Sequence, residues 1–277
     1  MQKVGQVSKP CPNLTLLPLS EAVQSLVTLL EPRLPDKLMH PHEKVSDAVL
    51  VALEVLRVLH KHPYRSVWFT LILLNFYPNL PSYTQIYTRL ERLGHLIETW
   101  HQAPESVEIA VVDSFPLPVC RPKRAHSCKV RFASLGYGTQ GSVYGFKGHV
   151  WTTPQGRILQ YRLDSAHHHD FPMACELNQS WSAFGAPQVI GDKAYVSDGI
   201  ATPPKTNATR ASRWKEEYAS MRTGVERTFS WIVRTGVRNS QIKTFKTLRS
   251  RVAYAVLYQV ALRRFQNRSR ESGWKLK

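Results

Sequence analysis

The stretch PQVIGDKAYVSDG, residues 187–199, places an acid, Asp192, directly after a short apolar run. The earlier stretch VEIAVVDSFPLPV, residues 107–119, has the same design, because its apolar run ends at Asp113. Short apolar runs of this kind, bounded by turn residues, are typical of buried strands. We therefore expect two buried strands that each end in a carboxylate.

The rest of the second half predicts further strands and helices. The segments VYGFKGHVWTT (143–153) and RILQYRLDS (157–165) flank the turn PQG, which indicates an antiparallel hairpin. Helical spacing of apolar residues predicts helices over about 170–181, 212–234 and 247–265. The order strand, hairpin, helix, strand, helix, helix indicates an α/β domain with a mixed sheet flanked by helices.

The first hundred residues predict helices instead. Apolar residues recur at helical spacing in 20–32, 46–62 and 81–101, with Ser46 as an N-cap and Ser82 with Gln85 as a capping box. We expect a helical N-terminal domain over 1–105 and a second domain, with basic C-terminal helices, over 106–277.

Positive charge is concentrated in the second half of the chain. The formal net charge is +17, yet residues 1–106 carry 10 basic and 9 acidic residues. Residues 227–277 carry 13 basic residues and one acid. Such asymmetry indicates a polyanionic partner for the second half, with a solvated basic tail as the alternative. The near-neutral N-terminal helices are a weaker candidate for binding DNA.

The remaining composition predicts a cytoplasmic protein. The longest apolar run, residues 67–77, is too short to span a bilayer, and the first residues do not resemble a secretory signal. The cysteines form no disulfide framework. Cys120, Cys128 and His126 are an incomplete zinc set, so we expect reduced structural thiols.

Three acids are candidates for a shared metal site. If the two strands are neighbours, Asp113 and Asp192 project from the same end of the sheet, and Glu226 lies on a helix that packs back on it. Three converging carboxylates can hold two Mg²⁺ ions that activate a nucleophile and stabilise a leaving oxygen. The alternatives are turn capping by each aspartate and a surface ion pair of Glu226 with Arg222. Asp164 and Asp170 are the nearest rivals, and the histidines before Asp170 indicate a solvated loop.

Basic residues near these acids are candidate phosphate ligands. Lys147 and His149 share one face of a strand, and Arg222 and Arg234 lie on the helix of Glu226. The candidate DNA contacts are Arg121, Lys123, Arg124, Lys147, His149, Lys193, Arg222 and Arg234.

Four segments resemble the DDE transposases of bacterial insertion sequences: VVDSFPLPVCRPKRAH, YGFKGHVWTTPQGRI, VIGDKAY and GVERTFSWIVR. The resemblance covers about residues 107–265 and implies an RNase H-like catalytic domain with two Mg²⁺ or Mn²⁺ ions. By motif it implies the triad Asp113, Asp192 and Glu226. Tyr218, Arg222 and Glu226 resemble the family's Tyr-Arg-Glu-Lys pattern, with Arg234 near the usual lysine.

This resemblance implies a transposase that binds terminal inverted repeats, cuts DNA and joins the exposed 3′-hydroxyls to target DNA. The expected partner is double-stranded DNA, both transposon ends and target, bound by a homodimer in the bacterial cytoplasm or nucleoid. The N-terminal helices are candidates for end binding. The alternatives are a metal-dependent nuclease that never joins strands and an inactive DNA-binding protein.

Overall fold

The computed structural model describes residues 18–30, 32, 45–60, 65–73, 81–100, 107–138, 141–169, 188–195, 199–204, 216–235, 237 and 242–271. The chain divides into two compact units, one of residues 1–90 with 257–277 and the other of residues 91–256. The domain boundary at 105/106 remains a prediction. No helix among the described residues combines the length and the hydropathy needed to cross a bilayer.

The first unit is helical, as predicted. It contains α1 (Leu19–Leu30), α2 (Asp47–Leu59), α3 (Ser66–Leu73) and the start of α4 (Tyr83–Trp100). The Ser46 hydroxyl accepts from the Val49 amide at 3.3 Å, which confirms the predicted N-cap. Ser82 and Gln85 exchange the two hydrogen bonds of a capping box, at 3.3 and 2.8 Å.

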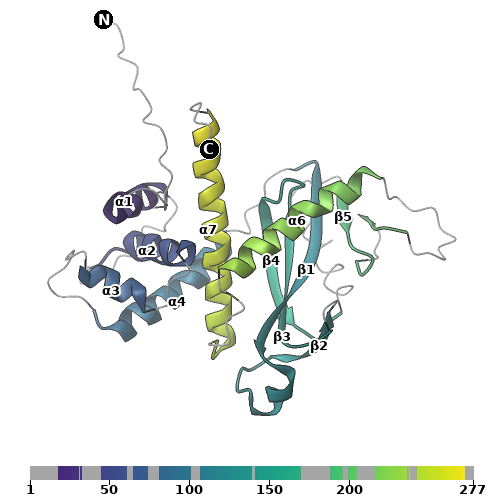
Figure 1. The fold of residues 1–277 in the computed structure, drawn as a ribbon, viewed down its shortest axis with the longest axis horizontal. Coiled ribbons are helices and arrows are strands. Elements are labelled where there is room, and N and C mark those ends of the chain that lie inside the picture. The colour runs from purple at the N-terminus through teal and green to yellow at the C-terminus, as the bar shows by residue number, and fades with distance from the viewer. Residues whose placement is uncertain are drawn as a thin grey trace, which may run out of the picture. The chain divides into compact units, whose positions relative to one another are not determined.

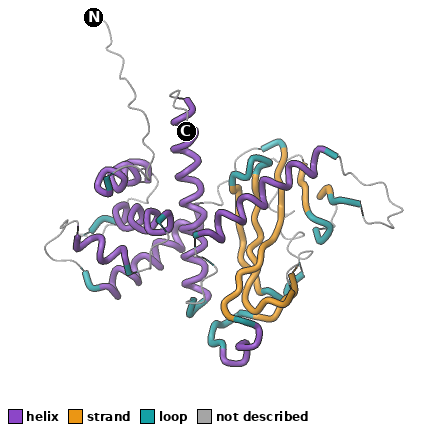
Figure 2. The backbone as a smooth tube through the Cα atoms, in the orientation of Figure 1, coloured by secondary structure: helices purple, strands orange, loops and turns teal. Residues whose placement is uncertain are grey.

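The second unit is built on a mixed sheet (Figures 1 and 2). The predicted hairpin is confirmed as β3 (Gly141–Thr152) and β4 (Ile158–Ser165), which pair antiparallel. β1 (Ile109–Cys120) pairs antiparallel with β3 and parallel with β5 (Gln188–Gly191), and β5 pairs parallel with β6 (Ile200–Ala201). The strand order is β2-β3-β1-β5-β6, with β4 also paired to β3. β2 (Ser134–Gly138) and the 3₁₀ helix η3 (Pro122–Ser127) were not predicted.

β1 is longer than predicted. It continues beyond Asp113 to Cys120, paired with β3 throughout, whereas its pairing with β5 ends at Val112. Pro116 and Pro118 therefore lie where no described strand pairs with that edge. Proline lacks the amide that a second neighbour would require, so it is tolerated there. Asp113 thus marks the end of the parallel pairing and not the end of the strand.

The helix α6 (Glu217–Arg234) covers one face of this sheet and crosses it diagonally (Figure 1). Its buried side chains Tyr218 and Val225 pack with Val111, Ile190 and Ala201. The opposite face has its own core of Ala110, Val112, Trp151, Leu159, Val189, Tyr195 and Ile200. Burial on both faces explains why the sequences of β1 and β5 are continuously apolar before each acid.

The second unit also contains the end of α4 and the start of α7 (Phe245–Glu271). Arg249 of α7 forms a bidentate ion pair with Glu98 of α4, with a shortest distance of 2.6 Å. A Cβ at Gly94 would lie 2.8 Å from the Ser250 Cα, so the two helices approach closely here. The predicted helix over 170–181, including Asp170, lies outside the described residues.

Candidate active site

Asp113 and Asp192 lie side by side at one end of the parallel strand pair. Val112 pairs with Gly191 at the last position of the β1–β5 register, and each aspartate is the next residue along its strand. The condition that the two strands are neighbours is therefore met. Because parallel strands run in the same direction, both acids lie at the same end of the parallel pairing.

The guanidinium of Arg222 lies between the two carboxylates. Its Nη2 is 3.8 Å from Asp113 Oδ2 and 3.7 Å from Asp192 Oδ1, so these oxygens are at most about 7.5 Å apart. The side chain of Asp113 is 16% exposed and that of Asp192 is 43% exposed. The Arg222 Nε is buried without a hydrogen-bond partner among the described residues. The site therefore joins two carboxylates and one cation that retains an unused donor.

Local hydrogen bonds orient both aspartates. The Asp113 Oδ1 accepts from the Ser114 amide at 2.7 Å, and the Asp192 Oδ1 accepts from the Lys193 amide at 2.6 Å. The Tyr195 amide also donates to the Asp192 carbonyl at 2.9 Å, which closes a turn after β5.

Glu226 lies on α6, one helical turn after Arg222, with an exposed side chain. The sequence analysis gave a surface ion pair between Arg222 and Glu226 as an alternative. In the structure the Arg222 guanidinium lies instead next to the two aspartates. The tilted contact of Phe229 with Phe115, with ring centroids 4.8 Å apart, places the next turn of α6 over the residue two positions after Asp113. Glu226 therefore lies on the segment of α6 between Arg222 and Phe229, the two residues that contact this part of the sheet.

Gly224 allows α6 to approach the sheet at this point. A Cβ at Gly224 would lie 2.1 Å from the carbonyl oxygen of Pro154, in the β3–β4 turn. Thr228, one turn later, donates to the Gly156 carbonyl of the same turn at 2.7 Å and is fully buried. This docking fixes the position of the helix that carries Arg222 and Glu226. The sequence feature that could have indicated this close approach is a glycine in the interior of a helix, where glycine is unfavourable.

Lys147 and His149 lie on the other face of the sheet. His149 pairs with Ser114, whereas Asp113 pairs with Val150, and successive side chains in a strand alternate between faces. His149 is 1% exposed, and its Nδ1 is 2.9 Å from the hydroxyl of Tyr195, which is fully buried. A buried imidazole on that face has no access to a phosphate bound at the acids. It instead holds the turn after β5 through Tyr195, a residue for which the sequence predicted no role.

The other predicted DNA contacts are spread along the unit. Lys147 donates to the His168 carbonyl at 3.1 Å, and Lys193 is exposed next to Asp192. Arg121, Lys123 and Arg124 are exposed at the far end of β1, about 26 Å from Asp113 at ~3.3 Å per residue. The shorter predicted strand implied that these basic residues flank the acids. The structure shows that they do not. Arg234 ends α6, and its side chain lies outside the description.

The other candidate metal ligands are two cysteines and a histidine–aspartate pair. Cys120 and Cys128 are free cysteines. Burial, together with a hydrogen bond to Cys128, raises the pKa of the Cys120 thiol. The Nδ1 of His168, in the turn after β4, lies 2.7 Å from the Oδ1 of Asp164, which belongs to β4. In the described part of the chain, no three His, Cys, Asp or Glu side chains come close enough together to hold a metal ion, and this includes Asp113, Asp192 and Glu226.

Residues 103–218 match the family model described as a transposase DDE domain. This part of the chain is therefore similar to a transposase DDE domain, and the mixed sheet flanked by helices agrees with the RNase H-like fold that the resemblance implied. The matched segment contains Asp113 and Asp192 and ends before Glu226. No curated protein matches the chain significantly.

Proposed function

We propose that this protein is a DNA transposase that binds the terminal inverted repeats of an insertion sequence, cuts the DNA and joins its ends to target DNA. The observation that carries the proposal is the meeting of Asp113 and Asp192 at one cation, inside a segment that matches a transposase DDE domain. Glu226 is the third acid of the proposed site.

The donor set fits Mg²⁺ or Mn²⁺. Two carboxylate oxygens on adjacent strands lie next to the same positive group, the Arg222 guanidinium. Mg²⁺ prefers oxygen ligands of this kind and leaves positions in its coordination sphere for phosphate oxygens. Asp113 and Asp192 would hold the ions from the sheet, and Glu226 would be the ligand supplied by α6. Bound there, two divalent ions would activate the nucleophile and stabilise the leaving oxygen.

The chain's own groups position the DNA phosphate. Arg222 lies against both aspartates and its side chain is 23% exposed, so its guanidinium is accessible to a scissile phosphate that arrives between them. In the first step water attacks the phosphorus at the transposon end, and the bond to the 3′-oxygen breaks to leave a 3′-hydroxyl. In the second step that hydroxyl attacks a target phosphate, and the target's own 3′-oxygen leaves. Positioning and electrostatics carry both steps without a covalent enzyme intermediate.

Basic residues away from the acids would bind the flanking duplex. Arg121 and Arg124 line one cavity with Lys129 and Lys243, and Lys123 is exposed beside it. A separation of about 26 Å from Asp113 is less than one turn of DNA, about 34 Å, so one duplex can contact both regions. The N-terminal helices are proposed to bind the ends, and a homodimer would hold two ends together.

Strand cleavage and strand transfer test this proposal separately. Asp113→Asn, Asp192→Asn and Glu226→Gln should each abolish Mg²⁺-dependent nicking of an end-containing duplex while DNA affinity changes little. Asp164→Asn, a rival acid paired with His168, should cleave like the natural protein. Pre-cleaved ends should be joined to target DNA. Nicking without joining would indicate a nuclease, and DNA binding without nicking would indicate an inactive DNA-binding protein.

A further inference from the structure

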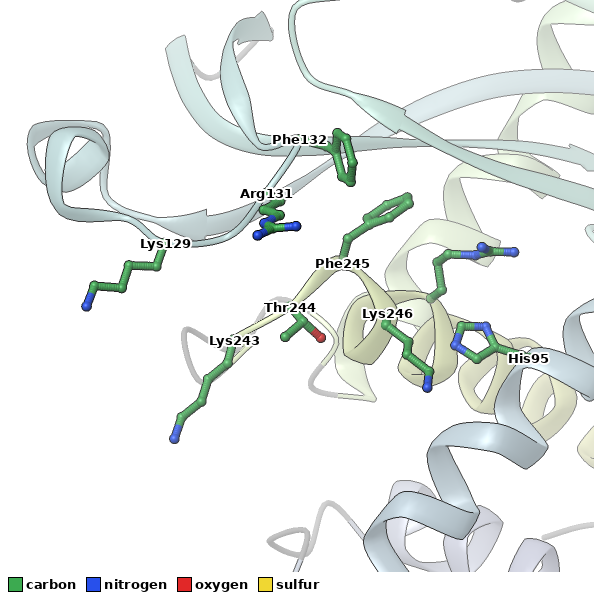
Figure 3. A pocket seen from close by; sticks show the side chains of 9 residues that line it. His95, Lys129, Arg131, Phe132, Lys243, Thr244, Phe245 and Lys246 are labelled. Atoms are coloured by element: carbon green, nitrogen blue, oxygen red, sulfur yellow. The ribbon is translucent and has the colours of Figure 1, made fainter.

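A second cavity in the catalytic unit combines exposed aromatic rings with positive charge. Its volume is about 590 Å³, and it lies between the segment after η3 and the N-terminal end of α7 (Figure 3). Phe132 and Phe245 supply its rings. The site is separate from the proposed catalytic acids, since none of the three lines it.

Phe132 is held in an unfavourable state. Its ring is 72% exposed, although water contact with so large an apolar group is costly. Its backbone has φ of 67°, in the left-handed region that a bulky residue rarely adopts. The Ser165 hydroxyl donates to its carbonyl at 2.7 Å and holds the segment in place. Strain of this kind, maintained by surrounding structure, is concentrated at ligand sites.

Phe245 gives the exposed ring a fixed neighbour. It stacks on Phe146 of β3, with centroids 4.8 Å apart and planes at 25°. Phe132 meets Phe245 edge to face at 6.1 Å. The Phe132 ring is therefore positioned by a packed partner on one side, and its other surface is open to a ligand (Figure 3).

The cations around these rings favour an anionic ligand. Glu91 pairs with Lys246 and Glu98 pairs with Arg249, so these charges are neutralised. Lys129, Arg131 and Lys243 line the same cavity and have no ion pair among the described residues. The first turn of α7, which opens toward the cavity, contains no acid. Three unpaired cations beside open aromatic surface match the phosphates and bases of a nucleic acid strand.

The cavity lies on the same face of the sheet as Asp113. Leu117 of β1 pairs with Phe146, and Leu117 is four residues after Asp113, so the two side chains share a face. Four residues of strand span about 13 Å, which corresponds to roughly four base steps of a DNA strand at ~3.4 Å each. A strand that crosses the acids can therefore reach Phe132.

We propose that this cavity binds an unpaired stretch of the DNA strand, with one base on the Phe132 ring and its phosphates on Lys129, Arg131 and Lys243. The base must be unpaired because the faces of bases in a duplex are already stacked. The proposal rests on DNA as the partner of the transposase domain and adds a single-strand site to it.

The test uses a thymidine oligonucleotide that carries one 2-aminopurine, with the full-length protein in EDTA so that no cleavage occurs. Binding should quench the 2-aminopurine in the single strand and not in the matching duplex. Phe132→Asn removes the ring but tolerates the left-handed backbone, so the fold should persist. It should weaken single-strand binding about tenfold and abolish the quench. Phe132→Tyr should retain both.

Tyr137→Asn is the matched control, because Tyr137 is an equally exposed aromatic residue, at 77%, that does not line this cavity. Arg131→Gln should lower the dependence of log affinity on log salt concentration by about 0.7. Unchanged affinity in Phe132→Asn, an equal loss in Tyr137→Asn, or preferential binding of polyglutamate would overturn the proposal. Strand transfer without the quench would contradict only this site, and the quench without strand transfer would contradict only the proposed reaction.

Discussion

Gly224→Ala tests whether the docking of α6 positions Arg222 and Glu226, the proposed catalytic groups of this helix. In an ordinary helix interior this change stabilises by about 1 kcal/mol, because alanine has the higher helix propensity. Here the new Cβ would lie 2.1 Å from the Pro154 carbonyl oxygen and 2.9 Å from its carbonyl carbon. Both atoms belong to the backbone of the β3–β4 turn, so no side chain can rotate away.

The magnitude follows from this contact. Real Cβ atoms stay beyond 3.0 Å, so the helix and the turn must separate by about 0.9 Å. The separation stretches the 2.7 Å bond from Thr228 to Gly156 and moves Arg222 and Glu226 with the helix. We expect a net loss of about 1–3 kcal/mol in the free energy of unfolding, as for other overpacked sites. Cleavage should fall by about a hundredfold, since a 1 Å displacement of catalytic groups has that effect.

Denaturant unfolding and a nicking assay measure the two effects. Gly138→Ala is the matched control, because among the described residues a Cβ there meets no atom closer than the Gly141 oxygen at 4.0 Å and the backbone is not left-handed. It should leave both stability and cleavage unchanged. A Gly224→Ala protein that is as stable as the natural one and cleaves normally would refute the tight docking of α6.

Two further predictions concern buried polar groups. Tyr195→Phe removes the hydroxyl that pairs with His149 at 2.9 Å and should lower the free energy of unfolding by about 1–2 kcal/mol and slow cleavage without weakening DNA binding. Tyr161→Phe should cost nothing, because the Tyr161 hydroxyl is buried without a partner among the described residues, and an equal loss in both variants would contradict the role given to Tyr195. Because burial and the Cys128 hydrogen bond raise the pKa of the Cys120 thiol, its thiolate fraction should be small at about pH 8 and should grow only at higher pH. Iodoacetamide should therefore modify Cys120 more slowly than glutathione at that pH, as measured by mass spectrometry, and a rate equal to that of glutathione would be evidence against the shift.

The sequence predicted the elements that local patterns encode. The hairpin, the strand before Asp192 and the caps at Ser46 and Ser82 each depend on a few neighbouring residues. The juxtaposition of the two strands that carry the aspartates was predicted only as a condition, because strand pairing is a long-range property. The register that places Val112 opposite Gly191 shows that this condition is met.

The errors have a common physical origin in β1. The strand was predicted to end at Asp113 because the apolar run ends there, but it continues through Pro116 and Pro118, which are compatible with a strand edge that has no partner. The longer strand carries Arg121 and its basic neighbours far from the acids. The face on which each β3 side chain lies also depends on the pairing register. The sequence therefore did not predict that His149 and Asp113 lie on different faces of the sheet.

The aromatic cavity was also beyond the reach of the sequence. Phe132 and Phe245 are far apart in the chain, and neither belongs to a motif. The sequence analysis did not predict a left-handed backbone at Phe132, and a phenylalanine is normally assigned to the core. In the structure Phe245 packs on Phe146, whereas Phe132 stays exposed at the surface. Neither arrangement can be recognised from the local sequence.

The central claim is that Asp113, Asp192 and Glu226 share a pair of divalent ions. A crystal structure of the protein grown with Mn²⁺ and an end-containing DNA, with data collected at the manganese absorption edge, tests it most directly. The account predicts two anomalous peaks about 3.5–4 Å apart, with oxygen ligands from all three acids. Manganese bound elsewhere, or bound without Glu226, would contradict it.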